Sequence, residues 1–143
     1  MKFNEFYSLT IVHSRDIILV KGVDYMNITK QKSQKTFDKQ AADYDTNIQG
    51  EHARKLYKPI IENLKNKNIH SILDLGCGTG ALLKEIKELN IAEQLFGIDI
   101  SPNMLEIAEN KLGNDATLIL GDSERLPFED SSFDAIVCND SFH

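Results

Sequence analysis

The fold is decided by one stretch of the chain, Ile72-Leu73-Asp74-Leu75-Gly76-Cys77-Gly78-Thr79-Gly80. Its first half belongs to an apolar pattern that predicts a buried strand over residues 71–75, and three glycines at alternate positions follow. Glycine has no Cβ and tolerates positive φ, so the backbone can turn sharply here and lie against a ligand. A helix that begins after Gly80 would offer free N–H groups at its first turn. The stretch therefore predicts a ligand-binding turn at the carboxyl end of the first strand of an α/β sheet.

Strand and helix patterns alternate on the carboxyl side of this turn. Apolar residues at helical spacing follow Gly80, and Ser101 with Pro102 marks the start of another helix. Further buried-strand patterns occur at residues 95–100, 116–120 and 133–138. Such alternation implies parallel strands. We therefore expect an α/β fold with a Rossmann-like open parallel sheet and helices on both faces.

Two helices are predicted on the amino side of the turn. Apolar residues recur at helical spacing over residues 29–48 and again over residues 51–66. Pro59 lies within the second pattern, where it either kinks the helix or marks its first turn.

Residues 1–25 are less regular than the rest of the chain. Residues 8–12 and 17–20 have the composition of short strands, but no glycine-rich turn joins them. We expect residues 1–25 to lie outside the core fold, as an appendage, a disordered tail or the product of a misplaced start codon.

Composition and charge narrow the class of protein. With 143 residues the chain is at most one domain, and 41% hydrophobic with 27% charged residues suits a globular protein. The net charge of −6 argues against broad phosphate-backbone binding, so we expect no nucleic-acid partner. Residues 26–68 carry nine Lys and Arg against five Asp and Glu, whereas residues 69–143 carry four against fourteen. This split is typical of a solvated helical face.

Cysteine usage and hydropathy indicate the compartment. Cys77 and Cys138 lack metal-ligand spacing and have the character of small buried thiols in a reducing compartment. No stretch approaches the roughly 20 apolar residues of a membrane span. Polar residues 13–16 interrupt the apolar opening, which is unlike a signal peptide. We therefore expect a cytoplasmic protein with no membrane span and no metal site.

Acidic residues follow the second and third predicted strands of the core. Asp99 comes 19 residues after Gly80, where a carboxylate in a nucleotide-binding sheet accepts hydrogen bonds from ribose hydroxyls. Gly121-Asp122 follows the next strand, and a carboxylate there can accept from an exocyclic adenine amine. The alternatives are a solvent-exposed strand-end Asp99 and an ordinary Gly-Asp turn. The glycine turn upstream favours the ligand roles.

The fourth and first strands of the core carry further polar candidates. Asn139 and Asp140 follow the fourth strand and should lie at the ligand crevice. His143 is a candidate acid or base, although a lone terminal histidine is more often exposed and idle. Asp74 stands within an apolar strand, where burying a charge without a partner is unfavourable. A cationic ligand, or the N–H groups of the turn, would offset that penalty.

These motifs, in this order, resemble those of the class I S-adenosylmethionine-dependent methyltransferases. The resemblance covers roughly residues 37–143 and points most to the small-molecule enzymes that include the ubiquinone and menaquinone methyltransferases. Its motifs are residues 74–80, residues 97–105, Gly121-Asp122 with residues 126–128, and residues 133–139.

At the methionine end of the cofactor, the resemblance implies roles for the turn and its neighbours. It would place the methionine portion against Gly76, Cys77, Gly78 and Gly80. Asp74 would lie near the amino group of this portion, and Asn139 close by. Tyr44 resembles a tyrosine of an amino-terminal lid that closes over the cofactor; the alternative for Tyr44 is plain helix packing.

At the nucleoside end, the resemblance implies that Asp99 binds the ribose. Ile100 and Met104 would pack on the adenine ring. Asp122 would face the adenine amine, with Ser123 beside it.

The implied reaction is in-line transfer of the sulfonium methyl group to a small-molecule acceptor. The protein would mainly align donor and acceptor and exclude water, so no catalytic residue is assigned. The chain would divide into an appendage at residues 1–25, lid helices at residues 26–68 and an S-adenosylmethionine-binding core at residues 69–143.

One departure from the family concerns the carboxyl end. The family's sheet normally has seven strands, whereas this sequence stops after the fourth strand of the core. We expect a truncated fold whose carboxyl-terminal strands are missing. The fourth strand would then expose an edge, which invites pairing with a second copy of the chain or with a complementing chain.

Two other functions remain open on the sequence. A truncated, catalytically inactive S-adenosylmethionine-binding protein would keep the same motifs. An NAD-dependent oxidoreductase would space its glycines as GxGxxG, whereas Gly76, Gly78 and Gly80 give GxGxG. The methyl acceptor and the atom methylated are not identified by any of these motifs.

Overall fold

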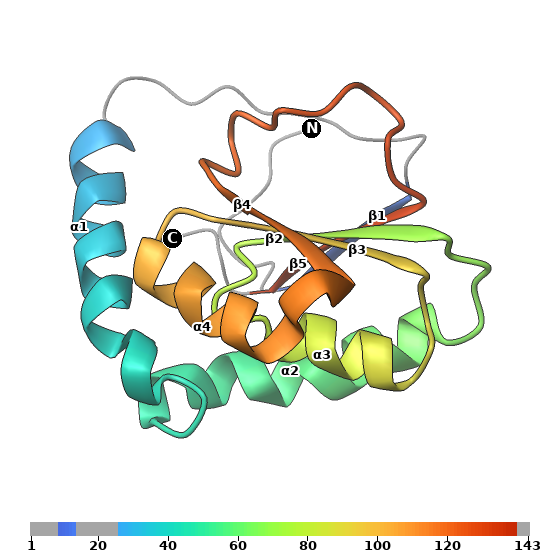
Figure 1. Cartoon of the computed structure of the whole chain (residues 1–143), viewed down its shortest axis with the longest axis horizontal. Coiled ribbons are helices and arrows are strands. Elements are labelled where there is room, and N and C mark those ends of the chain that lie inside the picture. The colour runs from blue at the N-terminus through green and yellow to red at the C-terminus, as the bar shows by residue number, and fades with distance from the viewer. Residues whose placement is uncertain (1–8, 14–25, 140–143) are drawn as a thin grey trace.

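Residues 9–13 and 26–139 are described by the computed structural model of the chain (Figure 1). Within these residues five strands form one sheet in the order β1-β5-β2-β3-β4. The strands are β1(Leu9–His13), β2(Ser71–Leu75), β3(Gln94–Asp99), β4(Ala116–Leu120) and β5(Ala135–Asn139). The helices are α1(Met26–Gln40), η1(Ala41–Asp43), α2(Ile48–Leu64), α3(Ala81–Glu88), α4(Pro102–Leu112) and η2(Gly113–Asp115). Strands β2 to β5 run parallel, and β1 pairs antiparallel with β5.

The order of the strands creates a switch point between β2 and β5. From β2 the chain runs through α3 to β3 and through α4 to β4, always toward the same edge of the sheet. Residues 121–134 then cross back over the sheet to β5, on the other side of β2. Ligands of open α/β sheets bind outside the carboxyl ends of the strands at such a point. The end of β2, Leu75, pairs with Cys138 of β5, so the glycine turn and the end of β5 lie together there.

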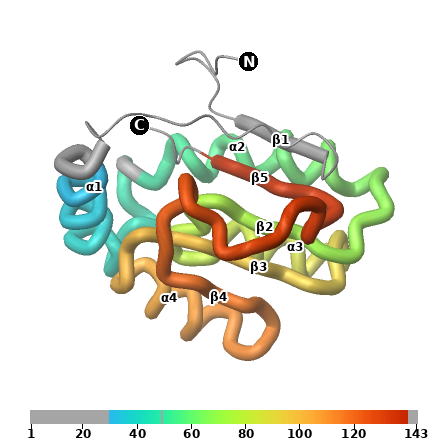
Figure 2. Tube along the Cα trace, turned by 90° about the horizontal axis from the view of Figure 1, so that it is seen from above, coloured from blue at the N-terminus to red at the C-terminus, as the bar shows by residue number. Residues whose placement is uncertain are grey.

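Each face of the sheet has its own apolar core. On one face α2, α3 and α4 pack against the strands, and their buried side chains include Leu83. On the other face, residues 121–134 cover the sheet (Figure 2). Aromatic rings meet edge to face there, with centroids 4.8 Å apart between Phe128 and Phe133 and 5.0 Å apart between Phe96 and Phe133. The expected Rossmann-like parallel sheet is confirmed. Helices were expected on both faces, but in the described part of the chain α2, α3 and α4 cover one face only. The other face is covered by residues 121–134, because the crossover from β4 to β5 is a loop.

Two helices precede the parallel strands, as the spacing predicts, but their bounds differ. The first predicted helix is divided into α1 and the short turn η1. The second begins behind Asn47, whose side chain accepts a hydrogen bond from the N–H of Gly50 at 2.7 Å. Pro59 lies inside α2, so its alternative place at a first turn is wrong. None of the helices in the described residues is long and apolar enough to cross a membrane.

The amino-terminal residues contribute a strand to the sheet. Strand β1 pairs along the outer edge of β5, from Leu9 opposite Asn139 to His13 opposite Ala135. Residues 9–13 therefore extend the sheet rather than standing apart from it. An unpaired edge offers a row of N–H and C=O groups that another strand can take. The edge at which we expected a second copy or a complementing chain thus has a partner strand from the same chain. The other strand expected here, residues 17–20, lies outside the described residues.

Replacing Ser101 with alanine is expected to lower the free energy of unfolding by about 1 kcal/mol, the usual effect of losing an N-cap. Ser101 is fully buried at the start of α4; its hydroxyl accepts from the N–H of Met104 at 3.2 Å and donates to Asp38 at 2.5 Å. Urea denaturation measures the change. Ser132→Ala, at an exposed loop position, is the control, and equal stability of the two variants would contradict the capping role.

Candidate functional site

The stretch after β2 forms a tight turn in which three glycines adopt left-handed backbone angles. The φ angles of Gly76, Gly78 and Gly80 are 70°, 54° and 74°, values that other residues rarely adopt. The N–H of Gly76 donates to the carbonyl of Ile98 at 2.8 Å, which ties the turn to β3. A Cβ at Gly78 would meet nothing within 4 Å. A ligand can therefore approach the backbone closely at this position.

Asp99 at the end of β3 binds the glycine turn directly. One carboxylate oxygen accepts from the N–H of Gly78 at 2.8 Å, and the other accepts from the N–H of Ser101 at 2.9 Å. Burial raises the pKa of Asp99, and these backbone N–H groups counteract part of that shift. The carboxylate thus joins the carboxyl ends of β2 and β3. Of its neighbours, Ile100 is half-buried and Met104 is 1% exposed.

A small cavity of about 30 Å³ lies beside the turn. Predicted site residues line it, namely Tyr44, Asp74, Gly76, Cys77 and Asn139, together with Ala53, Tyr57 and Leu82. This volume is above the roughly 10–15 Å³ that a cavity needs to hold one water molecule. The cavity has room for one small polar group.

Asp74 is the most unusual residue of this cavity. It is 2% exposed, and among the described residues its Oδ1 atom has no hydrogen-bond partner. Burial, and secondarily the negative charge of Asp99, raise the pKa of Asp74 well above its usual range. A buried acceptor without a donor is unfavourable by about 1–3 kcal/mol. A ligand that brings a cationic donor, such as an ammonium group, would relieve this penalty.

Cys77 and Asn139 support the cavity from two sides. Burial, followed by the charges of Asp74 and Asp99, raises the pKa of the Cys77 thiol well above its usual value, so it remains a thiol. Its sulfur lies where a Cβ on Gly97 would be only 2.7 Å away, which shows tight packing of the turn on β3. The side-chain amide of Asn139 donates to the carbonyl of Ala53 at 3.0 Å and links β5 to α2.

Tyr57 of α2 is a cavity residue that the sequence did not single out. Burial raises the pKa of its phenol far above the usual value, and the nearby charges of Asp74 and Asp45 add to this effect, so the hydroxyl stays neutral. The helical spacing that predicts the buried face of α2 includes Ile60 and Ile61, and Tyr57 lies one turn before them. That spacing was the sequence signal that could have identified Tyr57 as a buried residue of α2.

Asp122 lies after β4, away from the cavity, and is held by a lysine of α1. The Nζ atom of Lys30 is 2.6 Å from Oδ2 of Asp122 and also contacts Glu124. The other oxygen accepts from the N–H of Glu124 at 2.9 Å. Partial burial raises the pKa of Asp122, but the hydrogen bonds from Lys30 and Glu124 outweigh it and lower the pKa below the usual value. Ser123 is half-buried beside it.

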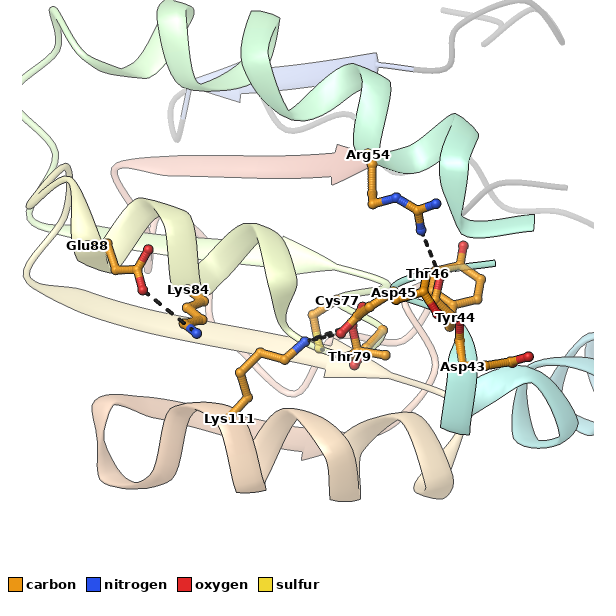
Figure 3. A network of polar contacts seen from close by, with 11 residues as sticks. Asp43, Tyr44, Asp45, Thr46, Arg54, Cys77, Thr79, Lys84, Glu88 and Lys111 are labelled. Carbon is orange, nitrogen blue, oxygen red and sulfur yellow. Dashed lines mark hydrogen bonds and ion pairs between the residues drawn. The ribbon is translucent and has the colours of Figure 1, made fainter. Parts of the chain in front are cut away.

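Residues 26–47, the first part of the lid predicted over residues 26–68 and called the lid segment below, are anchored along the carboxyl ends of the strands. Besides Lys30, Asp38 accepts from Ser101 at the start of α4, and Asp45 accepts from Thr79 in the glycine turn (Figure 3). The structure therefore brings Tyr44 to the glycine turn. Asp140 and His143 lie outside the described residues.

Replacing Gly50 with alanine is expected to displace Tyr44 and to destabilise the protein by about 1–3 kcal/mol, the usual penalty of overpacking. A Cβ at Gly50 would lie 2.0 Å from the carbonyl oxygen of Tyr44 and 2.6 Å from Arg54, whose guanidinium donates to that carbonyl at 2.9 Å. Thermal unfolding measures the change. His52→Ala is the matched control at an exposed position of the same helical turn, and a Gly50→Ala variant as stable as the control would contradict this packing.

Comparison with known proteins finds similarity over the part of the chain that contains the glycine turn and Asp99. Residues 72–143, about half of the chain, match a family model described as methyltransferase domain. The chain is 37% identical over 112 residues to demethylmenaquinone methyltransferase of Thermotoga maritima, covering 76% of this chain and 48% of that enzyme. It is 34% identical over 118 residues to malonyl-[acyl-carrier protein] O-methyltransferase of Priestia megaterium, covering 80% and 42%.

The chain also resembles a solved structure that contains a methyltransferase. A methyltransferase in complex with the Trm112 methyltransferase activator from Haloferax volcanii superposes with a TM-score of 0.57 at 30% identity, covering 68% of this chain and 44% of that one. The chain spans about half the length of the curated relatives it matches. The glycine turn and the strand order fit the family that the match over residues 72–143 indicates. The chain belongs to the class I S-adenosylmethionine-dependent methyltransferases.

Proposed function

We propose that the chain forms the S-adenosylmethionine-binding part of a methyltransferase that acts on a small-molecule acceptor. The observation that carries this proposal is the buried carboxylate of Asp74, whose Oδ1 lacks a donor among the described residues beside a cavity for one small group. The ammonium group of a methionine moiety is a cationic donor of suitable size. The residues present therefore fit this cofactor at its methionine end.

At the methionine end, the glycine turn would carry the backbone contacts. Gly78 has open space where a Cβ would stand, so the cofactor can lie against the peptide. Asp74 would accept from the ammonium group, with Asn139 nearby and Tyr44 closing the cavity from the lid segment.

At the nucleoside end, Asp99 would bind the ribose. Both of its oxygens already accept one backbone N–H each, and a carboxylate oxygen has a second lone pair for a ribose hydroxyl. Ile100 and Met104 would pack on the adenine, and Asp122 with Ser123 would face the adenine amine. Because Lys30 already contacts Asp122, the amine must share this carboxylate with Lys30 or displace it.

When bound, S-adenosylmethionine supplies a methyl group on a sulfonium, which already contains a good leaving group. The chain's own residues then hold the donor in line with the acceptor and exclude water, which is where such a site gains rate. The lid segment would contribute this exclusion through Tyr44. None of the described residues is assigned as a catalytic base.

The acceptor class is inferred from the named relatives. One relative is named for demethylmenaquinone and another for malonyl-[acyl-carrier protein], so the proposal stays with a small acceptor group rather than one compound.

The two free cysteines support the cytoplasmic location expected from the sequence. The oxidoreductase alternative has no support among these relatives, which are named as methyltransferases.

Methyl transfer can be tested separately from cofactor binding. The purified chain is incubated with S-adenosylmethionine and either a reduced demethylated naphthoquinone or a malonyl thioester, and release of S-adenosylhomocysteine is followed by mass spectrometry. Acceptor-dependent release would support the proposal. Cofactor binding with no release would favour the alternative of an inactive S-adenosylmethionine-binding protein.

A further inference from the structure

Three polar residues, Asp45, Thr79 and Lys111, form a cluster beside the turn that carries Tyr44. The Thr79 hydroxyl donates to Oδ1 of Asp45. The Nζ atom of Lys111 lies 2.5 Å from Oδ2 of Asp45 and 3.2 Å from the Thr79 hydroxyl oxygen (Figure 3). Asp45 belongs to the lid segment, Thr79 to the glycine turn and Lys111 to the last turn of α4. The cluster therefore joins three parts of the chain that are far apart in sequence.

The ion pair between Lys111 and Asp45 is less exposed than the ion pairs that form within single helices. The Lys111 and Asp45 side chains are 18% and 38% exposed, whereas those of Lys84 and Glu88 are 50% and 61% exposed. Thr79 is 3% exposed. Partly buried charges are screened less by water and salt than exposed ones. The pair can thus contribute to the position of the lid segment, whereas an exposed pair would contribute little.

The charge of Lys111 also balances the acidic surroundings of Asp45. The carboxylates of Asp74 and Asp45 both lie close enough to Tyr57 to raise the pKa of its phenol, and Asp99 acts on Asp74. Without the ammonium group of Lys111, Asp45 would add an uncompensated negative charge to this acidic end of the sheet. Like charges repel, so the turn around Asp45 would move away from the glycine turn.

Asp45 is the residue next to Tyr44, so a change at Asp45 is transmitted to Tyr44. Tyr44 lines the cavity with Asp74, and its ring packs edge to face on Phe37 with centroids 6.2 Å apart. We infer that Lys111 is a positioning residue: through Asp45 and Thr79 it holds Tyr44 over the cavity and fixes the glycine turn, and cofactor affinity depends on it although it lies on the outer helix α4. This inference rests on the proposed function.

The first test measures the lid segment without any cofactor. Hydrogen exchange of the backbone amides of residues 44–47 is compared in the wild type, Lys111→Met and Lys111→Arg. We expect Lys111→Met to accelerate this exchange about tenfold, equivalent to about 1.4 kcal/mol, and Lys111→Arg, which keeps the charge, to restore most of the protection. Lys87→Met is the matched control, because it removes an exposed lysine that pairs with Asp115 at another place on the surface.

The second test measures S-adenosylmethionine affinity by calorimetry and includes a double-mutant cycle with Tyr44→Ala. Lys111→Met should weaken binding about tenfold, and Tyr44→Ala should have a much smaller effect in Lys111→Met than in the wild type, because coupled residues are not additive. A merely structural role would lower thermal stability but leave the two effects on affinity additive.

The outcomes separate the inference from the proposed function. If the wild type binds S-adenosylmethionine but Lys111→Met matches Lys87→Met in exchange and affinity, the inference is wrong and the proposed function stands. Equal loss in Lys111→Met and Lys111→Arg, or additive effects in the cycle, would also overturn the inference. A folded wild type that does not bind S-adenosylmethionine would overturn the proposed function and the inference with it.

Discussion

Asp99→Ala is expected to weaken S-adenosylmethionine binding by about a hundredfold or more. The change removes the proposed ribose acceptor and, at the same time, the two hydrogen bonds that hold Gly78 and Ser101 at 2.8 Å and 2.9 Å. Hydrogen bonds to a charged group are worth about 1.5–3 kcal/mol each, and every 1.4 kcal/mol is about tenfold in affinity. Calorimetric titration of the variant measures the loss.

The chain contains a matched control for Asp99 at the other end of the same sheet. Asp134 accepts from the N–H groups of His70 and Ser71, both at 2.9 Å, at the start of β2. Asp134→Ala therefore also removes a carboxylate that binds two backbone N–H groups, but far from the glycine turn. We expect it to lower stability and to leave affinity near that of the wild type. Equal affinities of the two variants would contradict the role of Asp99.

Asp74→Asn is expected to have opposite effects on stability and binding. Asparagine has nearly the same shape as aspartate and carries no charge, so the ligand-free protein should become more stable, because the variant no longer buries an unpaired charge. Cofactor binding should weaken by roughly ten- to a hundredfold, because the amide is a poorer acceptor for an ammonium group. Urea denaturation and calorimetry on the same samples measure both effects.

The stability difference between wild type and Asp74→Asn should depend on pH. Because burial raises the pKa of Asp74 in the folded protein, the folded state binds this proton more tightly than the unfolded state does. The ionised carboxylate therefore destabilises the folded protein at high pH, and this penalty decreases as the pH falls through the raised pKa. The advantage of Asp74→Asn should be largest above the raised pKa and should shrink as the pH falls toward the ordinary range of an aspartate, about 4. An advantage that grows on acidification, or a variant less stable than the wild type at about pH 8, would contradict the account of Asp74 as a buried, poorly solvated carboxylate.

Local sequence patterns predicted the parallel core well. The strand predicted at residues 71–75 has the same first and last residues as β2. An apolar run that ends directly at a glycine leaves little doubt about where the strand stops. Ser101 and Pro102 marked the start of α4 for equally local reasons, namely a side-chain cap and a proline that needs no N–H partner. The first helix was predicted too long: α1 ends at Gln40, and Arg54 donates to the carbonyls of Tyr44 and Asn47 in the segment that follows.

The candidate site was only partly predictable, because several of its contacts join residues far apart in sequence. The glycine turn, Asp74 and Asp99 follow from a local motif at the ends of two strands. The contact of Lys30 with Asp122 spans 92 residues and that of Lys111 with Asp45 spans 66 residues. No periodicity or motif specifies such pairs, since either lysine would serve equally well as an exposed residue of its helix.

The most direct test of the central claim is calorimetric titration of the purified, folded chain with S-adenosylmethionine, next to NAD. The account predicts one-to-one binding of S-adenosylmethionine with a dissociation constant near the micromolar range, about −8 kcal/mol, and no heat with NAD. Binding of NAD instead, or no binding of S-adenosylmethionine by a sample shown to be folded, would contradict it.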